Sequence, residues 1–185
     1  MYTRKIYLTG GDPRELDEVF RHVPGVVETA VGEIEAVGEI ETDDNVWQSL
    51  RAAVEVVYNP KKVDISMLLD ILFTVVDPRL SDGQGAMRGE KYRAGAWYES
   101  SEDVPHIELY RNFLQNRGKP PAATAAGLTI NDTETDAKKK YPCHAKFGRA
   151  EKFVRGAAEQ QGYYQSHDKG EAFIDFEKLA ACLTF

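Results

Sequence analysis

The sequence predicts an α+β domain, a two-layer sandwich in which helices cover a mixed β-sheet. Stretches with strand character and stretches with helical periodicity follow in the order strand, helix, strand, and this order then repeats. The 185 residues are 42% hydrophobic and 29% charged, which provides enough apolar material for one sizeable core. No linker, internal repeat or low-complexity segment divides the chain. We therefore expect residues 1–185 to form a single domain.

The first strand leads directly into the first helix. Residues 5–9 have strand character, and Gly10 and Gly11 allow a turn in backbone conformations that other residues avoid. Asp12 stands at the N-cap position of the following helix, and Glu15 completes the spacing of a capping box. A side chain at position 12 is therefore expected at the positive end of a helix, where a nucleophile is activated or an anion is bound.

The remaining elements are assigned by the same criteria. A second helix begins after Asp64 and ends before Pro78. The loop predicted at 78–91 is long, and loops of this length are more often functional than idle. The other predicted elements are strands at 26–31, 52–58, 92–99 and 122–130, helices at 104–115, 147–161 and 173–182, and loops at 33–45 and 131–141.

Charge and cysteine usage limit the partners and the compartment. The net charge of −7 argues against nucleic acid and against an anionic membrane as the main partner. No apolar run approaches the roughly 20 residues of a membrane span, and Met1 leads almost directly into a strand, without a signal peptide. Cys143 and Cys182 are too few for a disulfide scaffold. We expect a cytoplasmic protein that binds neither nucleic acid nor membrane.

Local chemistry alone identifies no enzyme. Cys143 precedes His144, but adjacent side chains seldom point the same way, and such cysteines are more often packing residues. Asp is a preferred N-cap for stability alone, so Asp12 has a structural as well as a catalytic interpretation. Neither a metal nor a cofactor is expected, because the four histidines are scattered without the spacing of metal ligands: His22, His106, His144 and His167.

A pattern that extends over most of the chain carries more information than any single site. Its short motifs, in chain order, are Gly10-Gly11, Gly25-Val26, Val31-Gly32, Tyr58-Asn59-Pro60, Asp77-Pro78, Gln84-Gly85, Gly89, Tyr92-Arg93, Phe147 and Ala150-Glu151. Together they resemble the A-class peptide methionine sulfoxide reductases (MsrA). The resemblance is clearest over residues 4–155 and leaves 156–185 as a C-terminal extension. It implies the MsrA fold, with a ferredoxin-like core.

The resemblance also implies that the catalytic residues of the family are missing. The attacking cysteine of the family's Gly-Cys-Phe-Trp motif falls at Asp12, and the two aromatic residues that surround the substrate methyl group fall at Pro13 and Arg14. The acid of its Gly-His-Ala-Glu motif, which protonates the sulfoxide oxygen, falls at Ala52. A carboxylate is a poor nucleophile towards sulfur and lacks the thiol's oxidised and reduced states.

The rest of the implied pocket is only partly retained. The family's pocket Asp falls at Met87 and its downstream Gln at Lys91, whereas the second pocket tyrosine is kept at Tyr92. Charged groups at Lys91 or Arg93 could add to a remodelled pocket. The ligand pocket implied by the resemblance consists of Asp12, Arg14, Ala52, Met87 and Tyr92.

Three functional hypotheses follow. The leading one is a non-catalytic homologue that acts as a binding or regulatory protein and takes a methionine-containing peptide or a small anionic ligand. The second keeps the reductase activity of the family but supplies the thiol from Cys143 or Cys182 in the C-terminal part of the chain. The third is a different reaction in which Asp12 acts as general acid or base.

Overall fold

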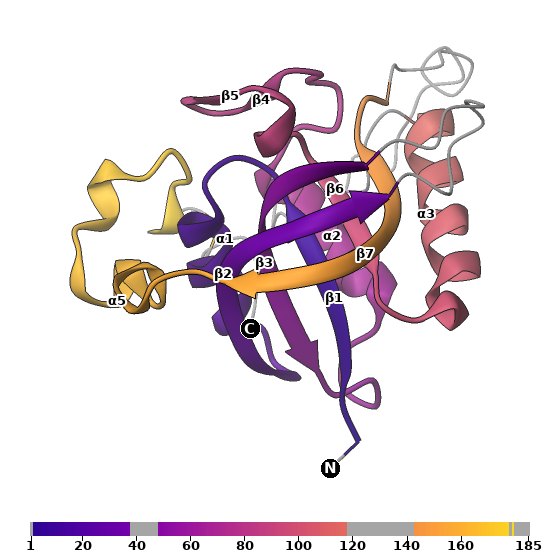
Figure 1. Ribbon diagram of the computed structural model, residues 1–185, viewed down its shortest axis with the longest axis horizontal. Coiled ribbons are helices and arrows are strands. Elements are labelled where there is room, and N and C mark those ends of the chain that lie inside the picture. The colour runs from indigo at the N-terminus through magenta and orange to yellow at the C-terminus, as the bar shows by residue number, and fades with distance from the viewer. Residues whose placement is uncertain (1, 38–47, 118–142, 178, 180–185) are drawn as a thin grey trace.

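The computed structural model describes residues 2–37, 48–117, 143–177 and 179. Within these ranges, one sheet contains, in spatial order, β1 (Arg4–Thr9), β3 (Gln48–Tyr58), β2 (Val26–Val37), β7 (Lys146–Arg155) and β6 (Gly95–Tyr98). The sheet closes into a barrel because β1 pairs with both β3 and β6 (Figure 1). The β6–β7 pairing is parallel and the others are antiparallel. The predicted α+β class with a mixed sheet is confirmed.

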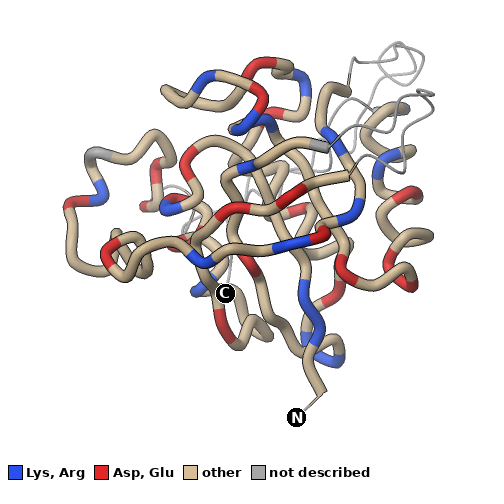
Figure 2. Tube along the Cα trace, viewed as in Figure 1, with Lys and Arg blue, Asp and Glu red and all other residues tan. Residues whose placement is uncertain are grey.

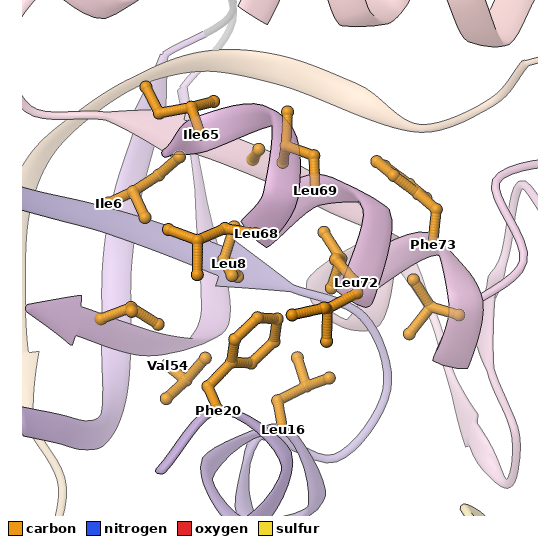
Figure 3. Close-up of a cluster of buried hydrophobic side chains, with 14 of the residues drawn as sticks. Ile6, Leu8, Leu16, Phe20, Val54, Ile65, Leu68, Leu69, Leu72 and Phe73 are labelled. Carbon is orange, nitrogen blue, oxygen red and sulfur yellow. The ribbon is translucent and has the colours of Figure 1, made fainter. Parts of the chain in front are cut away.

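Three helices pack against one face of the barrel wall: α1 (Pro13–Arg21), α2 (Ile65–Val75) and α3 (Val104–Arg117). Figure 3 shows the centre of this core, where side chains of α1 and α2 meet those of β1 and β3. Its fully buried members include Ile6, Leu8, Leu16, Phe20, Val54, Leu68, Leu69 and Leu72. This face carries most of the buried apolar surface, which is the main favourable term in folding.

The other face of the wall holds a smaller aromatic cluster. Trp97 is completely buried, and its Nε1 donates a hydrogen bond to Thr9 Oγ1 at 3.1 Å. The rings of Tyr7 and Phe153 lie 5.4 Å apart, and Ile34 packs beside them. Because successive side chains of a strand point to opposite faces, β1 supplies Ile6 to the helix side and Tyr7 to this cluster.

The prediction of a helix at 147–161 was wrong, because residues 146–155 form β7. A bulge places Ala36 opposite Ala150 but Glu35 opposite Lys152. The extra residue shifts the alternation, so Ala150 and Phe153, three positions apart, both pack into the aromatic cluster. A spacing of three imitates a helical period in the sequence.

Several other boundaries differ from the sequence predictions. The loop predicted at 33–45 is strand as far as Val37, because β2 is paired on both sides there. The predictions for 38–45, 122–130 and 131–141 fall outside the described residues, as do most of those for 173–182. The predicted loop at 78–91 contains β4 (Gly83–Gln84), β5 (Met87–Arg88) and the start of the 3₁₀ turn η1 (Glu90–Tyr92).

The C-terminal segment consists of short helical turns that lie beside α1 (Figure 1). These turns are η3 (Ala158–Gln160), α5 (Tyr163–Ser166) and η4 (Lys169–Glu171). Elsewhere in the chain, another 3₁₀ turn, η2 (Ser101–Asp103), precedes α3. No helix in the described ranges has both the length and the apolar character that crossing a membrane requires.

Candidate functional site

A cavity of about 580 Å³ lies at the start of α1. Its walls come from β2, β3 and the end of β7, and from the turns η1 and η3. A cavity of this size falls within the range of small-molecule sites, roughly 300–1,000 Å³. All five residues that the family resemblance implied as a pocket line it: Asp12, Arg14, Ala52, Met87 and Tyr92.

Asp12 caps α1 and is bound by the arginine two residues later. Its Oδ1 accepts a hydrogen bond from the backbone N–H of Arg14 at 2.9 Å. The Arg14 guanidinium also donates from Nε to both carboxylate oxygens at 3.1 Å and from Nη2 to Oδ2 at 2.7 Å. These hydrogen bonds with Asp12 raise the pKa of Arg14. Both oxygens therefore have donors, and the predicted N-cap is confirmed with Arg14 as its backbone donor.

The glycine turn before Asp12 is fastened to the turn η1. Gly11, at φ 70°, donates its backbone N–H to the carbonyl of Tyr92 at 2.8 Å. A Cβ at Gly10 would lie 2.8 Å from Val76 Cγ1, closer than packed carbon atoms approach. Only glycine fits this turn without strain. The turn thus holds Tyr92 in a fixed relation to Asp12 on the cavity wall.

A carboxylate that sequence reasoning missed lies across the ladder from Ala52. In the pairing of β2 with β3, Glu33 stands directly opposite Ala52, and in the pairing of β2 with β7 it stands opposite Val154. Directly opposed side chains share a sheet face, with Cβ atoms about 5 Å apart. All three residues line the cavity. Position 52 has no acid, but the neighbouring strand presents one to the same cavity.

Glu33 forms an ion pair with Lys91 of η1. Lys91 Nζ lies 2.6 Å from Glu33 Oε1, and both side chains are almost half exposed, at 43% and 46%. The hydrogen bond with Glu33 is the largest cause that raises the pKa of Lys91. The resemblance placed Lys91 beside the pocket but gave no partner for it. The motif Val31-Gly32, immediately before Glu33, was the one feature of the sequence that could have indicated a pocket residue at position 33.

The turn that carries Lys91 is anchored by a buried arginine. Arg51 is completely buried, and its Nη1 and Nη2 donate to the carbonyl of Glu90 at 3.0 Å and to Glu90 Oε1 at 2.7 Å. Its guanidinium also stacks 4.8 Å from the centre of the Trp97 ring. Because successive side chains of a strand alternate, Arg51 lies on the opposite face of β3 from Ala52, which lines the cavity. Its hydrogen bonds to Glu90 hold η1 in place from that face.

Three buried carboxylates of α1 hold the C-terminal segment in place. Glu15 Oε1 accepts from the backbone N–H of Ile174 at 2.9 Å, so it does not complete the expected capping box with Asp12. Asp17 Oδ2 accepts from the backbone N–H of Gly162 at 2.9 Å. Glu18 binds Gln165, Lys169 and His22. Figure 2 shows acidic and basic positions interspersed along the whole described chain.

The same segment completes the cavity. Gln160 lines it, and Gln161 binds both the N–H and the carbonyl of Val31 at 2.6 and 2.8 Å. The Tyr163 ring lies 4.2 Å from the Arg14 guanidinium, which is therefore held between Asp12 and an aromatic face. Gly156 and Gln160, at the start of the predicted C-terminal extension, are therefore part of the cavity wall.

The one cysteine among the described residues, Cys143, does not line this cavity. Cys143 packs half-buried against the main hydrophobic core and is not among the lining residues, and Cys182 falls outside the described residues. The histidines lie apart from one another in the chain, and His22 forms a hydrogen bond with the Glu18 carboxylate. Within the described ranges, no three His, Cys, Asp or Glu side chains are arranged to hold a metal ion.

Comparison with known proteins agrees with the fold. Residues 4–183 match the family model described as peptide methionine sulfoxide reductase. The peptide methionine sulfoxide reductases MsrA of Mycoplasma genitalium and Mycoplasma pneumoniae are 30% and 29% identical in alignments of 155 residues, and each alignment covers 78% of this chain and 99% of the relative.

Solved structures give the same result at lower identity. The structure of Mxr1 from Saccharomyces cerevisiae in reduced form superposes on this one with a TM-score of 0.67 at 17% identity. The superposition covers 93% of this chain and 88% of the Mxr1 chain. Methionine sulfoxide reductase A of Corynebacterium diphtheriae gives a TM-score of 0.65 at 17% identity, over 93% and 77%. At these identities the structures support the fold, and the family rests on the sequence matches. The chain belongs to the peptide methionine sulfoxide reductase family.

Proposed function

We propose that the protein is a non-catalytic member of its family, which uses the cavity at the start of α1 to bind a methionine-containing or small anionic ligand. One observation carries this proposal: both oxygens of Asp12 are taken up by Arg14 and by the helix N-terminus. A carboxylate in that state serves as a cap and a counter-ion. The same hydrogen bonds argue against Asp12 as a general acid or base, because a working acid needs a group free to exchange its proton.

The chemistry of sulfoxide reduction supports this reading. A thiolate must attack sulfur, be left as a sulfenic acid and be restored through a disulfide, and an acid must protonate the departing oxygen. Asp12 supplies no thiol, and Ala52 has no proton to give. Met87 adds apolar surface where the resemblance implied a carboxylate.

The first experiment measures reduction of free and peptide methionine sulfoxide by the purified protein, with dithiothreitol or thioredoxin as reductant. We expect no turnover. Turnover that Cys143→Ser or Cys182→Ser abolishes would overturn the proposal and establish the alternative, a reductase with a relocated thiol. Turnover lost in Asp12→Asn would instead favour a reaction at Asp12.

A second experiment tests the reason for inactivity. Asp12→Cys places a thiol at the helix N-terminus beside Arg14, where its pKa is lowered. We still expect little activity, because position 52 lacks an acid and the carboxylate of Glu33 opposite it is bound by Lys91. Adding Ala52→Glu should raise turnover by about 10² to 10⁴, the usual contribution of general acid catalysis. Equal turnover of the single and double variants would show that the missing acid is not the cause.

Binding is measured separately from turnover. Isothermal titration of the unaltered protein with a methionine-containing peptide and with L-methionine should give saturable binding, which Met87→Glu weakens by placing a charge on the cavity wall. The cytoplasm as compartment belongs to the same proposal and rests on the presence of only two cysteines.

A further inference from the structure

The ion pair between Glu33 and Lys91 stands open to the cavity. Both side chains line it, and each is almost half exposed. The strands on either side of Glu33 contribute Ala52 and Val154, which offer the carboxylate no hydrogen bonds. Within the described ranges, the side chain that binds the Glu33 carboxylate is Lys91. An exposed pair of this kind contributes little to stability, because water screens it and two long side chains must be held together.

The second ion pair of the cavity has the opposite character. Asp12 and Arg14 are 8% and 25% exposed and are joined by several hydrogen bonds, and the Tyr163 ring lies over the Arg14 guanidinium. An ion pair that is joined by several hydrogen bonds and largely buried is costly to separate. Of the two ion pairs whose members both line the cavity, one therefore stays closed and one opens at little cost. Arg155 is a further lining cation, and it lies 3.9 Å from Glu28, which does not line the cavity.

From this contrast we infer that the Glu33–Lys91 pair recognises the head group of a free amino acid. The ligand ammonium donates to the Glu33 carboxylate while the ligand carboxylate accepts from Lys91, so each protein charge exchanges one partner for another. A zwitterion presents its two charges side by side, as the open pair does. The charge of the site is unchanged by this exchange, and no buried charge is left without a partner.

The rest of the cavity suits an apolar amino-acid side chain. Met87, Tyr92 and Val154 line the cavity together with the ion pair. The flexible side chain of Met87 can adapt to the shape of a bound ligand. The inference rests on the proposed function and sharpens it, because an amino acid inside a peptide has no adjacent charges. It assigns the site to free amino acids of the methionine type in preference to internal peptide residues.

The test titrates four probes into the unaltered protein by isothermal calorimetry at low ionic strength: L-methionine, N-acetyl-L-methionine, L-methioninamide and N-acetyl-L-methioninamide. The first carries both charges, the next two carry one each, and the last carries none. We expect each lost charge to weaken binding about tenfold, as for hydrogen bonds to charged groups.

Two variants assign each charge to its residue. Glu33→Gln should remove the advantage of L-methioninamide over N-acetyl-L-methioninamide, which is the contribution of the ammonium. Lys91→Gln should remove the advantage of N-acetyl-L-methionine over N-acetyl-L-methioninamide, which is the contribution of the carboxylate. The matched controls are Glu35→Gln and Lys152→Gln, exposed positions of β2 and β7 outside the cavity, and both should leave all four affinities unchanged.

The outcomes separate this inference from the proposed function. Equal affinity for all four probes would overturn the inference while leaving a methionine-binding site in place. A dependence on the carboxylate alone would also overturn it, in favour of a simple anion site. Absence of binding by every probe would remove both the inference and the methionine ligand of the proposed function.

Discussion

Two ion pairs face the same cavity, and they differ in almost every physical respect. Asp12–Arg14 is local in sequence, largely buried and held by a fork of hydrogen bonds at the start of α1. Glu33–Lys91 joins residues 58 positions apart, is almost half exposed and depends on a single contact. The same kinds of charged group therefore serve two purposes, one to hold the site together and one to remain available to a ligand.

Burial and geometry account for this difference. A bidentate arginine–carboxylate contact is short, directional and partly shielded from water, so its charges act strongly on each other. A lysine is a flexible point charge, and water competes with its partner when both are exposed. We expect stability measurements to separate the two pairs clearly.

The largest effect is expected at the anchor beneath the exposed pair. Arg51→Ala should lower the free energy of unfolding by about 3 kcal/mol, because it leaves a cavity beside Trp97 and frees the turn that carries Lys91. Denaturant unfolding measures this loss, and Arg88→Ala on β5, where the arginine side chain is 60% exposed, provides the comparison. A loss below about 1 kcal/mol, typical of a surface position, would mean that η1 is held by other contacts.

Breaking the buried pair should have the next largest effect. Asp12→Ala removes the cap and leaves Arg14 without its carboxylate, so we expect a loss of about 2 kcal/mol in denaturant unfolding. Asp12→Asn keeps an acceptor for the helix N–H and should lose about half as much. Unchanged or raised stability in Asp12→Ala would contradict the structural role and point to a strained functional carboxylate.

Acid should loosen the C-terminal wall of the cavity by a smaller amount. Burial alone would raise the pKa of Glu18, but hydrogen bonds from His22, Lys169 and Gln165 outweigh it and lower the pKa. A lowered pKa gives stability that is present above the ordinary value, about 4.3, and is lost as the pH falls below it. The protection factors of the backbone amides at residues 163–171, corrected for the intrinsic exchange rate at each pH, should therefore fall below about pH 4.

The neighbouring carboxyl group of Glu15 has a pKa that is shifted in the opposite direction, so its contribution to stability depends on pH in the opposite way. Burial is the largest cause that raises the pKa of Glu15, so its contribution is fully present at low pH and is lost as the pH rises through the raised value. Glu18→Gln should remove the fall of the protection factors in acid, whereas Glu15→Gln should leave it in place. A fall that persists in Glu18→Gln would assign the acid sensitivity elsewhere.

The smallest effect is expected at the exposed pair itself. Glu33→Gln should change the free energy of unfolding by less than about 0.5 kcal/mol, the usual range for a surface ion pair. Thermal unfolding at low and high salt provides the measurement, and both traces should match the unaltered protein closely. A loss near that of Asp12→Ala would erase the distinction between the two pairs.

Parts of the site were predictable because they depend on neighbours in the chain. The glycine turn, the cap at Asp12 and the start of α1 are set by backbone conformation and by hydrogen bonds within three residues. The five residues implied by the family resemblance line one cavity, since the order and spacing of the short motifs follow the fold. Glu33 was missed because its place opposite Ala52 is a property of strand pairing.

The sequence by itself determined the fold class, the family and the absence of a thiol at position 12, because composition, periodicity and motif spacing are written along the chain. Only the tertiary structure decided that residues 146–155 form a strand, that Arg51 is buried under Trp97, and that Glu33 meets Lys91. Strand register, bulges and burial arise from contacts between distant segments, and those contacts override local preference. The cavity is built where such segments meet.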